Sequence, residues 1–388
     1  PQSAGYGDYC EEVLGMGRVE FMQAELNGSR MEVAKACSRG AAFARICAVT
    51  RDAGGLSIDP YMGIQAVWEL ARAIAAETGL PVHVSAPPPI TTWIGNDKAL
   101  LSECVERTLG PTWVVETLES NQVDELVSHL IDLASRHARV GIKRTRCASG
   151  MGNRHFPAEA LRDPAEVCGR VEAFLRDTEW DGEEAVLVVA WESASHSPST
   201  QIWIPARGAG MPRLDGIYEQ LLEREEGVFL GSRPCGLGVD VNRTLARASL
   251  KVCAALQSLG YVGRCSFDLL VLGDPRGRFE TRFMECNGRW GGTSTPMHLV
   301  DRIVEGPRPP YRAQDFQHAD LVGVPFAEIL RRVGPDLYRP STGEGRFVFY
   351  NTGPLANSGK LDVVSFGPTQ EAAERGLLED LPRLLGVN

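Results

Sequence analysis

The sequence lacks several features that would place the protein in a well-marked class. It has no uninterrupted run of about eighteen apolar residues, so it offers no candidate transmembrane helix. Its ten cysteines are scattered without C-x-x-C pairs or Cys/His clusters, which argues against a zinc site and for reduced thiols in a cytoplasmic protein. A formal net charge of −10 argues against nucleic acid or an anionic membrane as partner. Small molecules or short peptides are the expected partners.

Lysine is also scarce. Among the 40 basic residues, five are lysines, namely Lys35, Lys98, Lys143, Lys251 and Lys360. A lysine at a chemically informative position therefore carries more weight here than in most proteins. The phosphate-binding pattern G-x-x-x-x-G-K-[ST] is absent, which excludes the corresponding class of nucleotide site.

Length and periodicity predict a multidomain chain with mixed helices and strands. The 388 residues, 43% of them hydrophobic, suffice for two or three domains. Apolar residues at helical spacing predict a helix over 62–78, followed by a strand at 82–85 and a proline-rich linker. Beyond the linker, helical and strand patterns alternate, with helices over 97–109, 122–138, 164–178 and 241–259 and strands over 112–117, 140–144 and 185–190. We expect an α/β and α+β class and domains at 1–93, 94–192 and 193–388.

Two strand patterns joined by the turn GDPRG predict a β-hairpin. The strands are 263–272 and 278–287, and pairing of Leu272 with Phe279 fixes a register for the residues beyond. The register is an assumption, and a shift by one residue would move every side chain to the other face.

In this register three oxygen-bearing side chains gather on one face of the hairpin. Asp268 faces Phe283 and shares its side with Glu285 and Asn287, whereas Met284 points the other way. Carboxylate and amide oxygens suit Mg²⁺ or Mn²⁺ holding a polyphosphate. A solvated polar sheet face would produce the same alternation and is an equal alternative.

Three further segments are compatible with a nucleotide site. Lys143 ends an apolar strand directly before the glycine-containing loop CASGMGN, where it can neutralise phosphates. Lys98 begins a helix that Asn96 or Asp97 can cap. The strand 186–192, VLVVAWE, ends where main-chain groups could pair with an adenine edge. Taken singly, each segment is better explained without a nucleotide, as an exposed lysine beside a surface loop, an ordinary helix cap with a solvated lysine, and a core strand.

Taken together and in this order, these segments resemble the ATP-grasp superfamily of carboxylate–amine ligases, of the peptide or amino-acid ligase type. The matching pieces run from N-D-K at 96–98 to E-x-N-x-R at 285–289, within a resemblance that covers about residues 94–306. The resemblance implies two α+β subdomains that sandwich ATP, preceded by a smaller α/β N-terminal domain.

The resemblance also implies a set of site residues. Those expected to contact ATP are Lys98, Lys143, Ser149, Gly150, Gly152, Val189, Ala190, Trp191 and Glu192; those expected to bind the cation are Asp268, Glu285 and Asn287; and those expected to act in catalysis are Arg289 and Lys143. Glu192 is slightly displaced from the place where many family members carry a glutamate, so its contact with the nucleotide is the least secure of these.

The implied reaction is phosphorylation of a carboxylate by ATP, followed by attack of an amine on the acyl phosphate to form an amide or peptide bond. The substrates would be amino acids or short peptides, with Mg²⁺ or Mn²⁺ as cation, and a homodimer is compatible with this assignment. Two alternatives remain open, namely an ATP-grasp phosphotransferase and a nucleotide-binding module without turnover.

Overall fold

The computed structural model describes residues 2–25, 32–146, 152–223 and 228–387. The chain divides into two compact units. Unit 1 consists of Pro1–Ala86, Leu230–Pro234 and Trp290–Asn388, and unit 2 consists of Pro87–Phe229 and Cys235–Arg289. Within the described ranges, no helix is both long and apolar enough to cross a bilayer. The three-domain division expected from the sequence stays a prediction.

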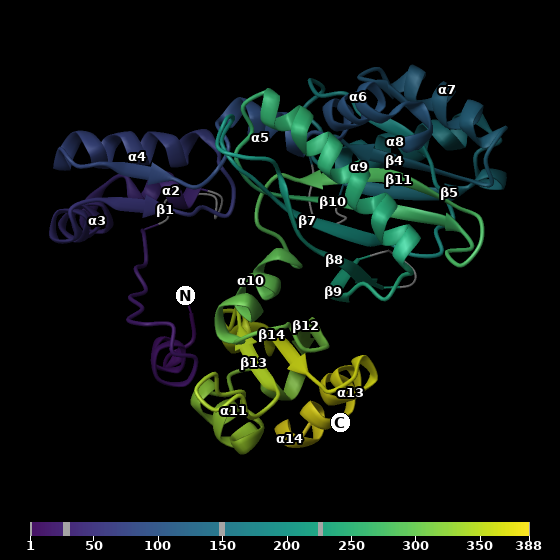
Figure 1. Cartoon of the computed structure of the whole chain (residues 1–388). Coiled ribbons are helices and arrows are strands. Elements are labelled where there is room, and N and C mark those ends of the chain that lie inside the picture. The colour runs from purple at the N-terminus through teal and green to yellow at the C-terminus, as the bar shows by residue number, and fades with distance from the viewer. Residues whose placement is uncertain (1, 26–31, 147–151, 224–227, 388) are drawn as a thin grey trace. The chain divides into compact units, whose positions relative to one another are not determined.

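The N-terminal part of unit 1 is a small α/β arrangement. Strands β1 (Leu56–Ile58) and β2 (Val82–Val84) pair in parallel, and helices α3 (Gly40–Ala53) and α4 (Gln65–Thr78) accompany them (Figure 1). Helix α4 ends at Gly79, whose φ of 70° suits glycine and stops the helix. The short helices α1 (Tyr6–Asp8) and α2 (Val33–Cys37) precede this arrangement. The expected α/β unit at this end of the chain is confirmed.

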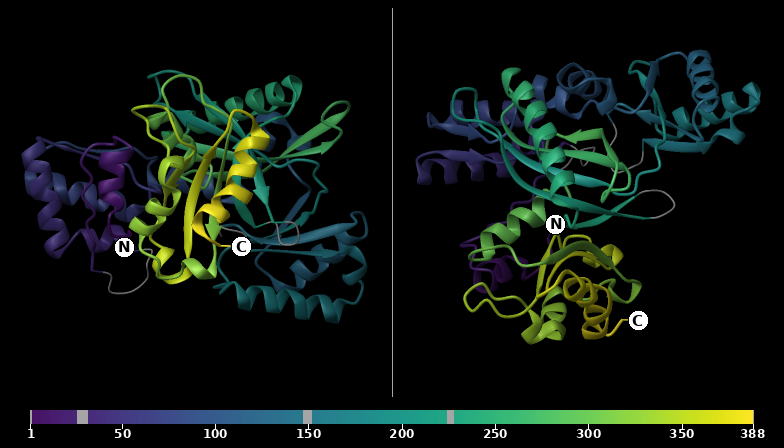
Figure 2. Two further views of the ribbon diagram at one scale, coloured as in Figure 1. Left: turned by 90° about the horizontal axis from the view of Figure 1, so that it is seen from below. Right: turned by 45° about the vertical axis from the view of Figure 1, so that its right-hand side comes forward.

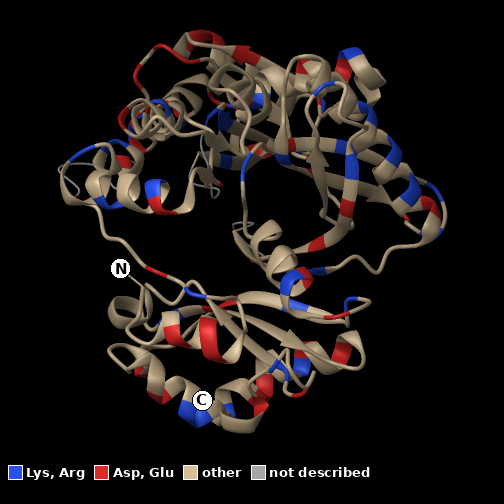
Figure 3. Ribbon diagram, turned by 60° about the vertical axis from the view of Figure 1, so that its left-hand side comes forward, with Lys and Arg blue, Asp and Glu red and all other residues tan. Residues whose placement is uncertain are grey.

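The C-terminal part of unit 1 is an antiparallel sheet with helices. Its strand order is β9-β12-β14-β13, and its elements are β9 (Phe229–Pro234), α10 (Ser294–Ile303), β12 (Tyr311–Gln317), α11 (Phe326–Val333), β13 (Phe347–Tyr350), α12 (Leu355–Ser358), β14 (Lys360–Phe366), α13 (Gln370–Arg375) and α14 (Leu381–Leu385). Acidic and basic residues both occur in the region around the C-terminus (Figure 3), and Arg346, directly before β13, pairs with Asp380 at 2.6 Å.

Unit 2 contains a small antiparallel sheet covered on one face by two helices. The strand order is β3-β6-β4-β5, with β3 (Thr117–Ser120), β4 (Arg139–Arg144), β5 (Asn153–Pro157) and β6 (Val186–Ala190). Helices α7 (Val123–Ala134) and α8 (Pro164–Asp177) lie together on one side of this sheet (Figure 2) and bury its apolar face. The strand expected over 112–117 is wrong, because Pro111–Trp113 forms a 3₁₀ turn and the strand begins at Thr117.

Unit 2 also contains a larger antiparallel sheet, with the order β11-β10-β7-β8. Its strands are β7 (Pro198–Ile204), β8 (Arg213–Leu222), β10 (Gly263–Gly273) and β11 (Phe279–Asn287). Helix α9 (Val239–Ser258) runs across one face (Figure 1) and packs Leu245 and Val252 against Phe267. Helices α5 (Pro89–Asn96) and α6 (Lys98–Leu109) complete the unit. The other face of this sheet carries the polar residues discussed below.

Candidate active site

The predicted hairpin exists, but its register differs from the expected one. At the turn, Phe279 pairs with Gly273, which shifts the pairing by one residue. A bulge then adds a further residue to β11, so that Asp268 pairs with Glu285 and not with Phe283. The shift alone would have placed the two carboxylates on opposite faces, and the bulge returns them to the same face.

The bulge also redirects Met284, which the expected register sends to the opposite side. Met284 is the extra residue of the bulge and packs against Val115, Leu187 and Val189 of the small-sheet region. A side chain at a bulge is re-aimed because the regular alternation is interrupted there. Met284 therefore connects the hairpin to the face of the small sheet that carries Lys143.

The three expected cation ligands lie together. Asn287 donates from Nδ2 to Oδ2 of Asp268 at 2.9 Å, which leaves the Oδ1 atom of Asn287 as its available oxygen. Burial and the neighbouring carboxylate of Glu285 raise the pKa of Asp268 to about 6, and hydrogen bonds from Ser199, Gln220 and Asn287 oppose the rise. Two carboxylates and an amide oxygen form the hard donor set that Mg²⁺ prefers. Among the described residues no cluster of three or more His, Cys, Asp and Glu is arranged for a metal, so this set depends on its amide.

The two expected phosphate lysines lie beside the same carboxylate. Lys98 Nζ is 3.3 Å from Oε2 of Glu285, and both Lys98 and Lys143 are buried, at 6% and 5% exposure. Burial lowers the pKa of Lys143 to about 8, Glu285 counteracts this, and Lys98 adds to it. The two lysines and the two carboxylates, Glu285 and Asp268, therefore form one cluster of opposite charges. A cation bound to the carboxylates would leave the lysines available to pair with an anion.

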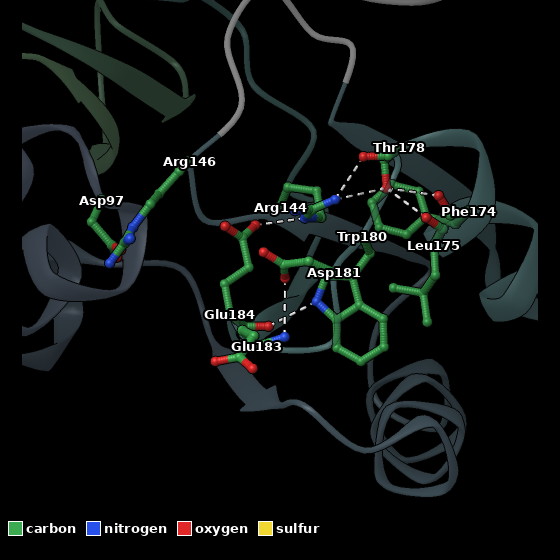
Figure 4. A network of polar contacts seen from close by, with 10 residues as sticks. All are labelled: Asp97, Arg144, Arg146, Phe174, Leu175, Thr178, Trp180, Asp181, Glu183 and Glu184. Atoms are coloured by element: carbon green, nitrogen blue, oxygen red, sulfur yellow. Dashed lines mark hydrogen bonds and ion pairs between the residues drawn. The ribbon is translucent and has the colours of Figure 1, made fainter.

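The end of strand β4 and the start of helix α6 are tied together, which sets the position of Lys98. Asp97 caps α6 by accepting from Leu100 N at 3.2 Å, as the sequence allowed, and also accepts from Arg146 Nε at 2.9 Å (Figure 4). The amide of Lys98 donates to the carbonyl of Thr145 at 3.2 Å. Lys98 is thus the first residue of α6, where the positive end of the helix dipole and the lysine together create a positive potential.

Arg144 anchors the strand on which Lys143 sits. Its guanidinium lies 2.5 Å from Oε1 of Glu184 and donates to the carbonyl of Thr178 at 2.7 Å (Figure 4). Its main-chain N–H donates to the carbonyl of Gly152 at 2.8 Å, so Gly152 continues the pairing of β4 with β5. These contacts hold the end of β4 and thereby the direction of Lys143.

Trp191 lies flat against the small sheet next to Lys143. Its ring centroid is 4.9 Å from Lys143 Nζ and 4.5 Å from the ring of His155, in a stacked arrangement. Gly141 makes this possible, because a Cβ there would be 2.5 Å from the Trp191 ring. The cation–π contact orients the lysine, at a typical strength of about 1 kcal/mol.

Two main-chain N–H groups at the end of β6, where the adenine contact is expected, are already engaged in hydrogen bonds. Val189 and Ala190 are buried in β6, and Trp191 and Glu192 follow it. The N–H groups of Ala190 and Trp191 donate to carbonyl oxygens of neighbouring segments at 2.9 and 3.0 Å. They cannot donate to a base at the same time, so a base contact here would use carbonyl oxygens or the N–H of Glu192.

The remaining expected residues are placed less fully. Arg289 is half-buried and lies two residues beyond Asn287, in the turn that follows β11. Ser149 and Gly150 lie outside the described residues.

Ser199, Gln201 and Gln220 belong to the site but have no recognisable signal in the sequence. They stand on β7 and β8. Strand β7 pairs with β10, and β8 pairs with β7, through contacts distant in sequence.

The architecture matches solved enzyme structures. An N5-carboxyaminoimidazole synthase from Aspergillus clavatus, solved with ADP and 5-aminoimidazole ribonucleotide, gives a TM-score of 0.56 at 13% identity over 84% of this chain and 86% of that chain. The corresponding synthetase from Thermus thermophilus gives 0.55 at 16% identity, over 85% and 81% of the two chains.

A third match is the biotin carboxylase domain of the Hydrogenobacter thermophilus 2-oxoglutarate carboxylase, solved with MgADP and bicarbonate. It gives a TM-score of 0.56 at 14% identity, over 92% of this chain and 85% of that chain. No family model and no curated protein sequence matches. The chain has the ATP-grasp fold, as expected from the order of its motifs.

Proposed function

We propose that the protein is an ATP- and Mg²⁺-dependent ligase that joins a carboxylate to an amine and releases ADP and phosphate. The observation that carries this proposal is the convergence of Lys98, Lys143, Asp268, Glu285 and Asn287 within one unit of the structure. The five residues come from four different elements, and a solvated sheet face would not require buried lysines beside carboxylates. The fold shared with ADP- and ATP-bound enzymes supports the same reading.

The basic and the oxygen-bearing residues of the site would have different roles. Lys98 and Lys143 would neutralise phosphate oxygens of ATP, and Asp268, Glu285 and Asn287 would hold the cation. A bound Mg²⁺ supplies positive charge to the phosphate oxygens and orients them. Positioning and charge neutralisation, more than proton transfer, would then supply the rate of phosphoryl transfer.

The acceptor side of the reaction involves Arg289 and exclusion of water. Arg289 would stabilise the transferring phosphoryl group or the carboxylate that receives it. The resulting acyl phosphate survives only if water is kept out until an amine attacks. The segment around Gly152 would exclude water by covering the phosphates. We propose amino acids or short peptides as substrates, in small-molecule or peptide biosynthesis.

The test is ADP release measured across a panel of carboxylates and amines, with mass detection of the product. The panel contains amino acids and short peptides, and also bicarbonate with 5-aminoimidazole ribonucleotide, which are named for the structural neighbours. Glu285→Gln and Lys143→Met should each lose at least about a hundredfold in rate, consistent with loss of one transition-state contact. Lys251→Ala, an exposed lysine of α9, is the matched control and should retain full activity.

The alternatives give different results in the same assay. ADP release that needs a phosphate acceptor but no amine would indicate a phosphotransferase, and binding of ATP without ADP release would indicate a module without turnover. If Glu285→Gln and Lys143→Met keep full activity, the proposed site is wrong.

A further inference from the structure

The carboxylate of Asp268 stands in a row of residues that crosses the large sheet. Glu285 on β11 pairs with Asp268 on β10, Asp268 pairs with Ser199 on β7, and Ser199 pairs with Tyr218 on β8. Paired residues in neighbouring strands project from the same face of a sheet. Ser199 therefore lies directly beside Asp268, on the side away from Glu285.

A chain of hydrogen bonds leads from Gln201 through Ser199 to Asp268. Gln201 donates from Nε2 to the hydroxyl oxygen of Ser199 at 3.0 Å. The Ser199 hydroxyl has one hydrogen, and Ser199 donates it in a hydrogen bond to the carboxylate of Asp268. Each donor in the chain thus points toward Asp268.

Gln220 adds a further donor from the next strand. Its main-chain N–H donates to the carbonyl of Ser197 at 3.1 Å, which fixes β8 against β7, and its side chain bonds Asp268. Asn287 approaches the carboxylate from β11. Asp268 is therefore held by donors from both neighbouring sides of its strand.

Gln201 is not explained by its contribution to folding. It is 1% exposed, and among the described residues no group donates to its buried Oε1 atom. A buried acceptor without a donor typically costs about 1–3 kcal/mol, and an apolar side chain at this position would avoid that cost. The contact that its amide does make is the bond from Nε2 to Ser199.

We propose that Gln201, Ser199 and Gln220 are positioning residues that fix the Asp268 carboxylate for cation binding. This inference rests on the proposed function, because it presupposes that Asp268 is a cation ligand. Fixing a ligating carboxylate by hydrogen bonds from residues that do not touch the metal commonly contributes about 10–100-fold to metal affinity. The three residues would therefore set how tightly the site holds its cation while making no contact with the nucleotide.

The experiment measures Mn²⁺ binding to the full chain in the presence of a saturating non-hydrolysable ATP analogue, by electron paramagnetic resonance of free Mn²⁺. Ser199→Ala and Gln201→Met should each weaken Mn²⁺ binding about tenfold. Thr200→Ala is the matched control, because Thr200 is buried on the same strand but bonds Ser249 of α9 at 2.9 Å on the opposite face. It should lower the unfolding temperature and leave Mn²⁺ affinity unchanged.

The outcomes separate this inference from the proposed function. Wild-type protein that binds no Mn²⁺, or binding that Glu285→Gln leaves unchanged, overturns the cation site and the inference with it. Glu285-dependent binding that Ser199→Ala and Gln201→Met leave within twofold, or that Thr200→Ala weakens equally, overturns the inference alone. If Ser199→Ala does not fold, Gln220→Ala replaces it, because Gln220 is a half-buried side chain. It should weaken Mn²⁺ binding, and an affinity within twofold of the wild type would overturn the inference.

Discussion

Replacement of Lys143 by methionine should stabilise unit 2 at neutral pH while removing its stabilisation by ATP. Lys143 is 5% exposed, and its pKa is lowered from 10.5 to about 8, chiefly by burial. A protonated lysine in this position is a cost to the folded protein that a phosphate ligand would relieve. Methionine has a similar length and carries no charge to bury.

The size of the effect follows from the pKa difference. A difference of about 2.5 between the ordinary pKa and that of Lys143 corresponds to about 3 kcal/mol. Loss of the cation–π contact with Trp191 reduces this stabilisation of the variant by about 1 kcal/mol. The expected net gain for Lys143→Met is therefore about 2 kcal/mol at pH 7, or roughly 4–8 °C in unfolding temperature for a unit of this size.

The pH dependence gives the prediction its sign. Between pH 8 and 10.5 the unfolded chain holds a proton on Lys143 that the folded chain has lost, so the stability of the wild type rises with pH there. Below pH 8 the wild type bears the full free-energy cost of burying the protonated Lys143. The unfolding temperature of the variant should therefore exceed that of the wild type by more at pH 7 than at pH 10. A variant that is less stable than the wild type at pH 7, with a gap independent of pH, would refute the reasoning.

Three further predictions concern other parts of the chain. Gly141→Ala should cost about 1–3 kcal/mol of unfolding free energy and raise the KM for ATP, because its Cβ would meet the Trp191 ring at 2.5 Å; unchanged thermal unfolding would contradict this. Arg144→Ala should cost about 2 kcal/mol in thermal unfolding, since it leaves the carboxylate of Glu184 without its ion pair, and Arg144→Ala with Glu184→Gln should recover part of the loss. Burial raises the pKa of Asp362 to about 7, so the folded chain keeps a proton that the unfolded chain loses, and the stability of unit 1 should fall as pH rises from about 4 to 7. Asp362→Asn should remove that fall in thermal unfolding, and a persistent decline in the variant would assign it to another group.

The elements that the sequence predicted well are those whose pattern is local. Helix α4 was recognised from apolar residues at helical spacing and from Gly79, and β6 from a continuous apolar run. The cap of α6 was narrowed to Asn96 or Asp97 because a cap is defined by its neighbours in sequence, and the structure shows that it is Asp97. The strand expected over 112–117 failed because the apolar residues there belong to a 3₁₀ turn and an extended segment that precedes β3.

The candidate cation site was predicted by a partly incorrect route. Alternation along the hairpin grouped Asp268, Glu285 and Asn287, but the assumed register was off at the turn. The bulge returned the two carboxylates to the same face of the sheet. A bulge cannot be predicted from a local pattern, because it arises from how the two strands fit one another and the residues they cover. The same bulge aimed Met284 at the small sheet.

The sequence by itself determined the chemical character of the site, since it supplied two of its five lysines, two carboxylates and an amide in an order that resembles a known family. The tertiary structure alone decided that Lys98 meets Glu285, that Lys143 lies against Trp191, and that Ser199 and Gln201 support Asp268. These contacts join residues from separate strands and helices. Their geometry is fixed by strand pairing and packing across the whole unit, which spacing along the chain does not encode.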